Sequence, residues 1–403
     1  MQKPSVLLVA TMDTKSREAG FIESCLKEAG CSVQVMDAGI RGESPVPVAI
    51  TRQEVARAGG YTLSEVQSMG HEGESLKMML KGACKIAGTL IDKNAIRGVI
   101  SLGGSMGTTL GTGVMRQFPI GVPKVMISTM ASRDTRAFVG TKDILMLHAV
   151  CDLSGLNRFS KKILYNGAMA LVGMTSQNQK DISSHKSMIF ISTLGTTEKC
   201  VQELRATLEK QGKEVVVFHT VGSGGKAMEE LMQSESIEAV VDLSLHEMAD
   251  HRFGGDYDAG PDRGSVALKK GIPVVLVPGN IDFLVSGPLE QSLKDFPDRP
   301  YHVHNSAITV VRTTREEIES IARQVGDYCN AASGRYTLVI PMKGFSAFDA
   351  KEGPLHDPQA PERFVKSLQA QLSDTSRIHT LPYHINDSGF SEAVIERLQK
   401  FLS

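Results

Sequence analysis

A glycine-rich stretch in the first half of the chain carries the clearest chemical signal. The β-branched run from Ile96 to Leu102 leads into Gly103-Gly104-Ser105-Met106-Gly107-Thr108. This order predicts a buried strand followed by a tight turn that opens a helix. Glycines let backbone amides come close to a ligand, and a helix N-terminus adds partial positive charge. The stretch therefore predicts a phosphate-binding loop.

Two other predicted strands of this half also end in polar residues. The residues that follow them are Thr11, Asp13 and Lys15 after the first strand, and Ser128 and Thr129 after a later one. Because ligands of parallel α/β sheets bind beyond the carboxyl ends of the strands, we expect these groups to meet the glycine loop. Lys15 then supplies positive charge or is simply solvated. Asp13 holds a magnesium ion through water or caps the helix.

The glycine loop matches neither of two common nucleotide-binding motifs. No lysine follows Gly107, so the loop is not a Walker loop. The dinucleotide G-x-G-x-x-G spacing and its acidic partner at the next strand end are also missing. The residues therefore predict a nucleotide or another phosphorylated ligand without naming a reaction.

The second half of the chain offers different candidates. Val221 to Met228 is another glycine-rich helix start and could form a second anion-binding turn. Arginines near turns either bind anions or form surface ion pairs, and Arg263, Arg299 and Arg312 fit both descriptions. The catalytic residues are unknown, and the candidates are Asp250, Arg312, His384 and Asp387.

Histidines raise the question of a metal site. His302 and His304 lie on one face of a predicted strand, and His384 belongs to a polar segment near the end of the chain. A site of two histidines and one carboxylate would need such residues. No H-E-x-x-H spacing is present. We therefore assign no metal ligands and expect these residues to organise a domain interface.

The elements that must position these groups occur twice. Thr11 to Gly30 and Thr193 to Gly212 have the same length, and each follows an apolar run and precedes another. Each copy is typical of strand, polar turn, amphipathic helix, glycine C-cap and strand. Later apolar runs, Ile96–Ile100 and Ile237–Val241, continue the correspondence. The repeat predicts parallel βαβ units in both halves.

The predicted fold is therefore α/β, with two Rossmann-like domains, mainly parallel sheets and duplicated βαβ units. We expect an N-terminal ligand-binding domain over residues 1–182 and a C-terminal domain with a second ligand cleft over residues 187–403. The polar stretch from Ser176 to His185 is typical of a linker. The helical segment Glu74 to Asp92 either covers the sheet of its own domain or forms a dimer contact.

Composition excludes several classes of protein. Of the 403 residues 41% are hydrophobic and 22% charged, which is typical of a globular protein and not of a disordered one. The net charge of −1, the lack of tryptophan and the 5% aromatic content argue against nucleic acid as a partner. No apolar run approaches membrane-spanning length. Six scattered cysteines without a C-x-x-C pair predict reduced thiols, and so a cytoplasmic protein.

Several ordered motifs together resemble the Tm-1-like ATP-binding family, also called uncharacterised protein family 0261, over essentially the whole chain. The motifs are Thr11-Met12-Asp13-Thr14-Lys15, Gly103 to Thr108, Ser128 to Ser132, Ala259-Gly260-Pro261-Asp262-Arg263, His304-Asn305, Arg312-Thr313-Thr314 and His384 to Asp387. The resemblance implies two Rossmann-like subdomains, a homodimer, and ATP held by the first subdomain; with ATP we expect Mg²⁺.

Two functions from different classes remain open. The first is ATP-dependent chemistry on a small metabolite in an interdomain cleft. The second is a non-catalytic nucleotide sensor that changes a partner surface. A metal-dependent hydrolase or lyase using the histidines is a third hypothesis.

Overall fold

The computed structural model describes residues 3–176 and 187–402. The chain separates into two compact units, Met1–Ile182 and Ser183–Ser403. Apart from Ser176, the predicted linker lies outside the described residues. No helix among the described residues is both long and apolar enough to cross a membrane.

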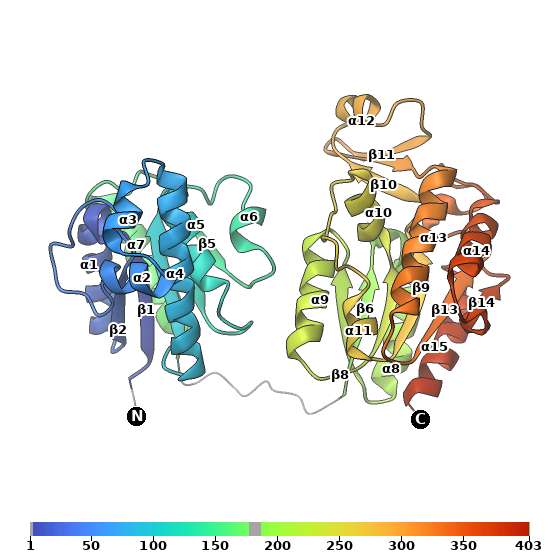
Figure 1. The fold of residues 1–403 in the computed structure, drawn as a ribbon, viewed down its shortest axis with the longest axis horizontal. Coiled ribbons are helices and arrows are strands. Elements are labelled where there is room, and N and C mark those ends of the chain that lie inside the picture. Colours follow the sequence, from blue (N-terminus) through green and yellow to red (C-terminus); the bar gives the residue numbers. More distant parts are fainter. Residues whose placement is uncertain (1–2, 177–186, 403) are drawn as a thin grey trace. The chain divides into compact units, whose positions relative to one another are not determined.

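The first unit is a five-stranded sheet with helices on both faces (Figure 1). Its strands follow the order β2-β1-β3-β4-β5, and every neighbouring pair is parallel. Its elements are β1 (Ser5–Ala10), α1 (Met12–Glu28), β2 (Ser32–Asp37), α2 (Arg52–Gly59), α3 (Leu63–Ser68), α4 (Glu72–Asp92), β3 (Gly98–Gly103), α5 (Ser105–Met115), β4 (Lys124–Ser128), α6 (Arg136–Val139), β5 (Leu145–His148) and α7 (Arg158–Met174).

Strand β1 shows why this sheet is buried on both faces. Val6 and Leu8 pack into a core with residues of α1 and α7, while Leu7 and Val9 pack into another with residues of α2, α4 and α5. Successive side chains of a strand point to opposite faces, so a continuous apolar run requires helices on each side. The predicted parallel α/β arrangement is confirmed here.

The second unit repeats this plan and extends it. Its main sheet follows the order β14-β13-β9-β8-β6-β7, with all neighbours parallel. Its elements are β6 (Met188–Thr193), α8 (Glu198–Lys210), β7 (Glu214–His219), α9 (Ser223–Ser234), β8 (Ile237–Ser244), α10 (His246–Phe253), α11 (Val266–Lys270), β9 (Val274–Gly279), β10 (Phe283–Ser286), α12 (Leu289–Asp295), β11 (Tyr301–Asn305), β12 (Ile308–Arg312), α13 (Arg315–Asn330), β13 (Tyr336–Pro341), α14 (Ala360–Gln371), β14 (Ile378–Leu381) and α15 (Ser388–Leu402).

The duplication expected from the sequence is present in the topology. If β6 is matched to β1, the order β7-β6-β8-β9-β13 repeats the order β2-β1-β3-β4-β5. The two glycines predicted to end the first helix of each copy, Gly30 and Gly212, have φ angles of 88° and 81°. In that left-handed region glycine avoids the strain that a Cβ would cause.

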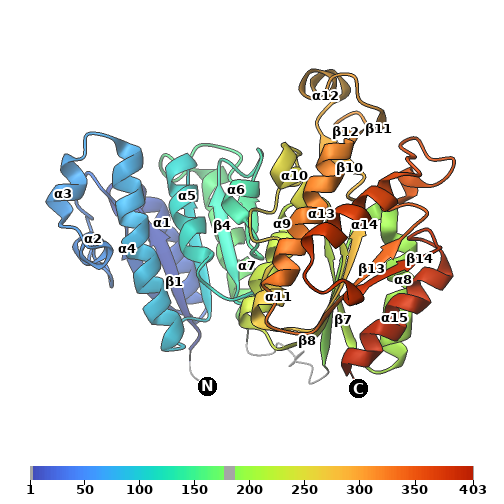
Figure 2. The same ribbon diagram turned by 45° about the vertical axis from the view of Figure 1, so that its right-hand side comes forward.

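Helices α2, α3 and α4 lie together on one side of the first unit (Figure 2). A Cβ placed on Gly82 of α4 would lie only 1.8 Å from the carbonyl oxygen of Val55 in α2, so these two helices pack very closely. Met79, Ala83 and Ala87 of α4 belong to the core over one face of the sheet. Of the two interpretations of this helix, the structure therefore supports the one in which it covers its own sheet.

One part of the second unit was not predicted. Strands β10, β12 and β11 form a separate antiparallel sheet, which lies with α12 at one end of this unit (Figure 1). This small sheet contains Arg312, at the end of β12, and the predicted pair His302 and His304, on β11.

Candidate functional site

A cavity of about 540 Å³ opens in the first unit between the ends of β1 and β3. Strand β2 lies on one side of β1 and strand β3 on the other, so the strand order reverses at this point. Doubly wound sheets bind their ligands at such a switch point. The residues that line the cavity are Thr11, Asp13, Thr14, Lys15, Ile40, Arg41, Gln67, Gly70, His71, Glu72, Ser75, Leu76, Gly103, Gly104, Ser105, Met106, Gly107 and Asp152. Seven of them, Thr11, Asp13, Lys15, Gly103, Gly104, Ser105 and Gly107, are predicted ligand-binding residues.

The first turn of α5 presents free donors to this cavity. The helix begins at Ser105, and its N-cap residue, Gly104, provides no side-chain hydrogen bond. The amides of Ser105, Met106 and Gly107 have no acceptor among the described residues. Unpaired amides and the helix dipole attract an anion to such a position.

The glycines of this loop have different structural roles. A Cβ on Gly103 would lie 2.7 Å from the Cα of Gly107, so these two residues pack backbone against backbone. A Cβ on Gly104 would meet nothing closer than the Thr129 hydroxyl, at 3.8 Å. Gly104 has φ −81°, which any residue can adopt. The fold therefore requires small residues at 103 and 107, whereas at 104 the missing side chain leaves cavity space open.

Thr108, Ser128 and Thr129 do not line the cavity. The Thr108 hydroxyl donates to the carbonyl oxygen of Gly104 at 2.6 Å and lies 2.6 Å from the Ser128 hydroxyl. Ser128 Oγ also accepts from the amide of Met130, at 2.9 Å. The amide of Thr129 donates to the carbonyl of Gly103. In this structure the three residues orient the loop that carries the free amides.

Lys15 lines the cavity, and its ammonium group also donates to the carbonyl oxygen of Leu153, in the loop after β5. It therefore joins the start of α1 to that loop. Asp152, the neighbour of Leu153, lines the cavity as well. The loop that follows the edge strand thus contributes to the site, which the sequence had not indicated.

Asp13 holds the segment that follows β2. Its Oδ2 accepts from the amides of Ile40, Arg41 and Gly42 at 3.2, 2.9 and 3.3 Å. Its Oδ1 is buried and has no hydrogen-bond partner within residues 3–176 and 187–402. Neither predicted role for Asp13 describes this contact, because the carboxylate binds a distant turn and not the first turn of its own helix.

The far wall of the cavity comes from the insertion between β2 and β3. The Gln67 amide donates to the carbonyl of Ile40 at 2.8 Å. His71, the N-cap of α4, accepts from the amide of Gly73. Glu72 forms an ion pair with Arg41. None of these residues was a predicted site residue, because they follow no strand directly and only the tertiary fold brings them to the switch point.

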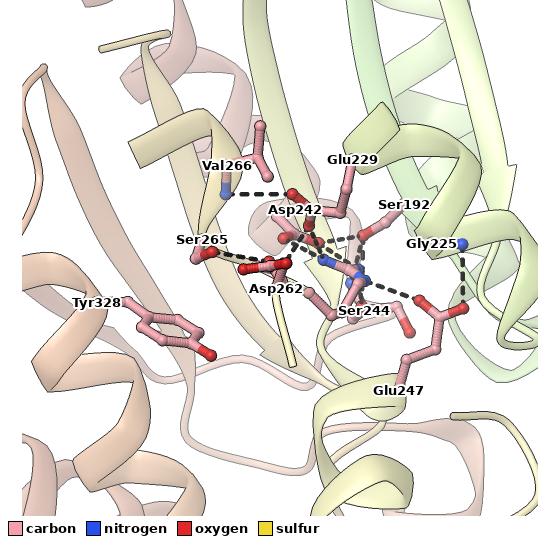
Figure 3. A network of polar contacts seen from close by, with 12 residues as sticks. Ser192, Gly225, Glu229, Asp242, Ser244, Glu247, Asp262, Ser265, Val266 and Tyr328 are labelled. Atoms are coloured by element: carbon pink, nitrogen blue, oxygen red, sulfur yellow. Dashed lines mark hydrogen bonds and ion pairs between the residues drawn. The ribbon is translucent and has the colours of Figure 1, made fainter. Parts of the chain in front are cut away.

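The corresponding region of the second unit is filled by its own side chains. Figure 3 shows Glu229, Asp242 and Glu247 converging on one place, where the fully buried guanidinium of Arg263 lies. Arg263 donates to both oxygens of Asp242 at 2.7 and 2.8 Å, to Glu247 at 2.7 Å and to the carbonyl of Ser244 at 2.8 Å. These contacts raise the pKa of Arg263 against the effect of burial, so it stays charged. Its donors are engaged inside the protein.

The second predicted anion-binding turn is also occupied from within. Glu247 Oε1 accepts from the amides of Gly222 and Gly225 at 2.7 and 3.0 Å, at the start of α9. A nearby cavity of about 500 Å³ lies between α9 and the loop that contains Pro261. Lys226, Glu229 and Asp258 line it together with residues of the Ala259–Arg263 motif.

The four candidate catalytic residues all make internal contacts. Asp250 accepts from the amide of Tyr257 at 2.8 Å and is 1% exposed. Arg312 donates to Asp349 at 3.0 Å and to the carbonyl of Leu355. These two residues stabilise loops of the second unit.

His384 and Asp387 form a local turn. Asp387 accepts from the amide of His384 at 2.8 Å. The His384 ring lies 2.9 Å from the Ser346 carbonyl at Nε2, and Nδ1 accepts from the amide of Asn386. In these contacts both residues have structural roles, and a catalytic role for any of the four candidates stays a prediction.

Metal-binding side chains are not gathered in the described parts of the chain. No group of three or more His, Cys, Asp and Glu residues there could hold a metal ion. The ring of His302 lies 5.0 Å from that of Phe348, so it packs against an aromatic side chain. The third predicted function, a metal-dependent hydrolase or lyase, gains no support from this arrangement.

Fold and sites together define a protein of two doubly wound α/β units, one open at its switch point and one filled there by a buried ionic network. The chain belongs to the uncharacterised protein family UPF0261: the model of the N-terminal domain matches residues 4–180 and that of the C-terminal domain residues 186–402. The resemblance stated from the motifs is therefore confirmed.

Relatives of this family extend over the whole chain. A UPF0261 protein of Clostridium tetani is 37% identical over 394 residues, which cover 98% of each chain. The ToMV resistance protein Tm-1(GCR237) of Solanum lycopersicum is 32% identical over 98% of this chain, but over only 55% of its own length. Among solved structures, MurG of Acinetobacter baumannii covers 98% of the chain at 11% identity with a TM-score of 0.24.

Proposed function

We propose that the first unit binds ATP, with the phosphates on the first turn of α5. The observation that carries the proposal is the set of free amides at Ser105, Met106 and Gly107, which face a cavity of about 540 Å³. Gly104 leaves space beside them for a phosphate oxygen. The resemblance to the Tm-1-like ATP-binding family supports ATP as the nucleotide.

We propose that ATP binds together with Mg²⁺. Among the lining residues, Asp13, Glu72 and Asp152 are acidic, while Lys15 and Arg41 are basic. An additional cation is needed before this surface can favour a highly charged anion. Magnesium prefers one or two carboxylates together with phosphate oxygens and water. Asp13, whose buried Oδ1 lacks a partner, and Asp152 are the residues that would hold it.

Of the two functions left open by the sequence, nucleotide binding without catalysis is supported more directly. The candidate catalytic groups Asp250, His384 and Asp387 form structural hydrogen bonds, as described above. ATP-dependent chemistry on a small metabolite is the second proposal. Steady ATP turnover that depends on an added metabolite would favour it, whereas ATP retention without turnover would favour a sensor.

The test of the main proposal is calorimetric titration of the full chain with ATP in the presence of Mg²⁺. We expect a single site per chain and at least about tenfold weaker binding after Gly104→Leu, since several amide contacts are lost together. Absence of binding by the unmodified protein, or unchanged affinity in the variant, would overturn the proposal.

The cellular location and the oligomeric state of the protein are also proposals. A cytoplasmic location is supported by the six cysteines, each of which is a free thiol. A homodimer is proposed on the family resemblance alone. Light scattering of the purified protein would test it, and a monomeric mass at micromolar concentration would contradict it.

A further inference from the structure

An ion pair crosses the rim of the cavity in the first unit. Arg41 follows β2, and Glu72 is the first residue of α4; both line the cavity. Their side chains are 73% and 56% exposed. An ion pair this open to water contributes little net stability, because each charge is solvated almost as well alone. The partners can therefore separate at low cost.

The backbone of Arg41 is held in place by hydrogen bonds, whereas its side chain is largely exposed. The amides of Ile40, Arg41 and Gly42 all donate to Asp13 Oδ2. The Gln67 side chain donates to the carbonyl of Ile40 in the same segment. The guanidinium therefore starts from a fixed point on the rim and needs only rotations about its own bonds to point elsewhere.

Of the two basic residues that line the cavity, Arg41 is the one whose side chain is more easily released from its internal partner. The Lys15 ammonium donates to the backbone carbonyl of Leu153. Arg41 makes its described side-chain contact with Glu72 alone. A guanidinium can bind a phosphate through two parallel hydrogen bonds. A bound, multiply charged phosphate attracts it more strongly than the single charge of the exposed Glu72 carboxylate.

We propose that Arg41 exchanges Glu72 for a phosphate of the bound nucleotide, so that Glu72 acts as an internal competitor that lowers the affinity of the site. This inference rests on the proposed nucleotide-binding function. The ligand class is a nucleoside polyphosphate or another ligand with a terminal phosphate near the rim. Because Glu72 competes for Arg41, a ligand must carry enough phosphate charge to displace Glu72 before it binds tightly.

The test is calorimetric titration of the full chain with ATP and Mg²⁺, using matched variants. Arg41→Ala should weaken binding about tenfold or more, since it removes a charge-assisted contact. Glu72→Gln should strengthen binding about two- to fivefold, because it releases Arg41. Glu74→Gln is the control: Glu74 lies in the same first turn of α4 and pairs with Lys77, but does not line the cavity. The affinity of the Glu74→Gln variant for ATP should match that of the unmodified protein.

The double variant separates exchange from simple charge repulsion. If Glu72 acts through Arg41, the gain from Glu72→Gln should disappear in an Arg41→Ala background. An equal gain in both backgrounds, or unchanged binding by Arg41→Ala, would overturn the exchange. ATP binding by the first unit would still stand in that case, provided that Gly104→Leu reduces the affinity. No binding by the unmodified protein would overturn both.

Discussion

The guanidinium of Arg263 meets the carboxylate of Asp242 through two hydrogen bonds, of 2.7 and 2.8 Å, with no side-chain exposure on the arginine. The same guanidinium contacts Glu247 and Glu229. Burial of a charge is costly unless it is paired, and here one cation pairs with three carboxylates. Arg263 therefore stabilises the second unit through the charges that it neutralises.

Removal of this cation should destabilise the second unit strongly. Arg263→Met fills similar space but leaves three buried carboxylates without their partner, at an expected cost of about 3–5 kcal/mol. Urea unfolding followed by circular dichroism measures the change. The control is Arg205→Met, because Arg205 pairs with Glu209 on the surface of α8 and should contribute less than about 1 kcal/mol. Equal effects of the two substitutions would contradict a structural role for Arg263.

Glu229 should make stability depend on pH. The pKa of its carboxyl is raised to about 7, because the effect of burial outweighs the opposite effect of the nearby Arg263 charge. Between the ordinary value of 4.5 and about 7 the unfolded chain releases this proton while the folded chain keeps it, so stability falls as pH rises. Relative to Glu229→Gln, the unmodified protein should lose about 3 kcal/mol between pH 4.5 and 8.

Urea unfolding of both proteins at several pH values measures this difference in stability. The contributions of the other titrating groups are common to both proteins and cancel. Glu235→Gln is a suitable control, because Glu235 is exposed at the end of α9. A stability difference between the protein and Glu229→Gln that is constant from pH 4.5 to 8 would rule out the raised pKa.

Neighbouring glycines of the α5 loop should separate binding from folding. Gly104→Leu places its side chain in open space and should change the free energy of unfolding by no more than about 1 kcal/mol. Gly103→Ala forces a contact with the backbone of Gly107 and should cost about 1–3 kcal/mol. Thermal unfolding measures both, with Gly173→Leu of α7, which also has open space, as the control. If Gly104→Leu proves as destabilising as Gly103→Ala, the assignment of their roles is incorrect.

Val150 is strained by its backbone. This residue has φ 61° and is 72% exposed, so a β-branched side chain occupies the left-handed region without gaining burial. Val150→Asn should stabilise the first unit by about 1 kcal/mol, because asparagine tolerates this region. Val46→Asn is the comparison, since Val46 is exposed but is not among the positive-φ residues. A loss of stability for Val150→Asn in urea unfolding would refute the strain.

Local sequence patterns were sufficient to predict the scaffold. The apolar runs at β1, β3, β6 and β8 and the glycines at 30 and 212 encode strands and helix ends within a few residues of themselves. Spacing repeated in both halves predicted the duplicated topology, and the stretch from Gly103 to Gly107 predicted a strand that ends at a helix start. Such features depend on periodicity and backbone conformation, which neighbouring residues largely decide.

The residue types alone determined which polar groups this protein has, but only the tertiary structure decided which of them are already satisfied. Ser128 and Thr108 share a buried hydrogen bond, and Glu247 fills the turn at Gly225, through partners 20 and 22 residues apart in the chain. Arg41 and Glu72, 31 positions apart in the insertion between β2 and β3, meet at the cavity only in the folded chain. A hydrogen bond or ion pair needs its atoms within about 3 to 4 Å, and no local pattern fixes such a distance between separate segments.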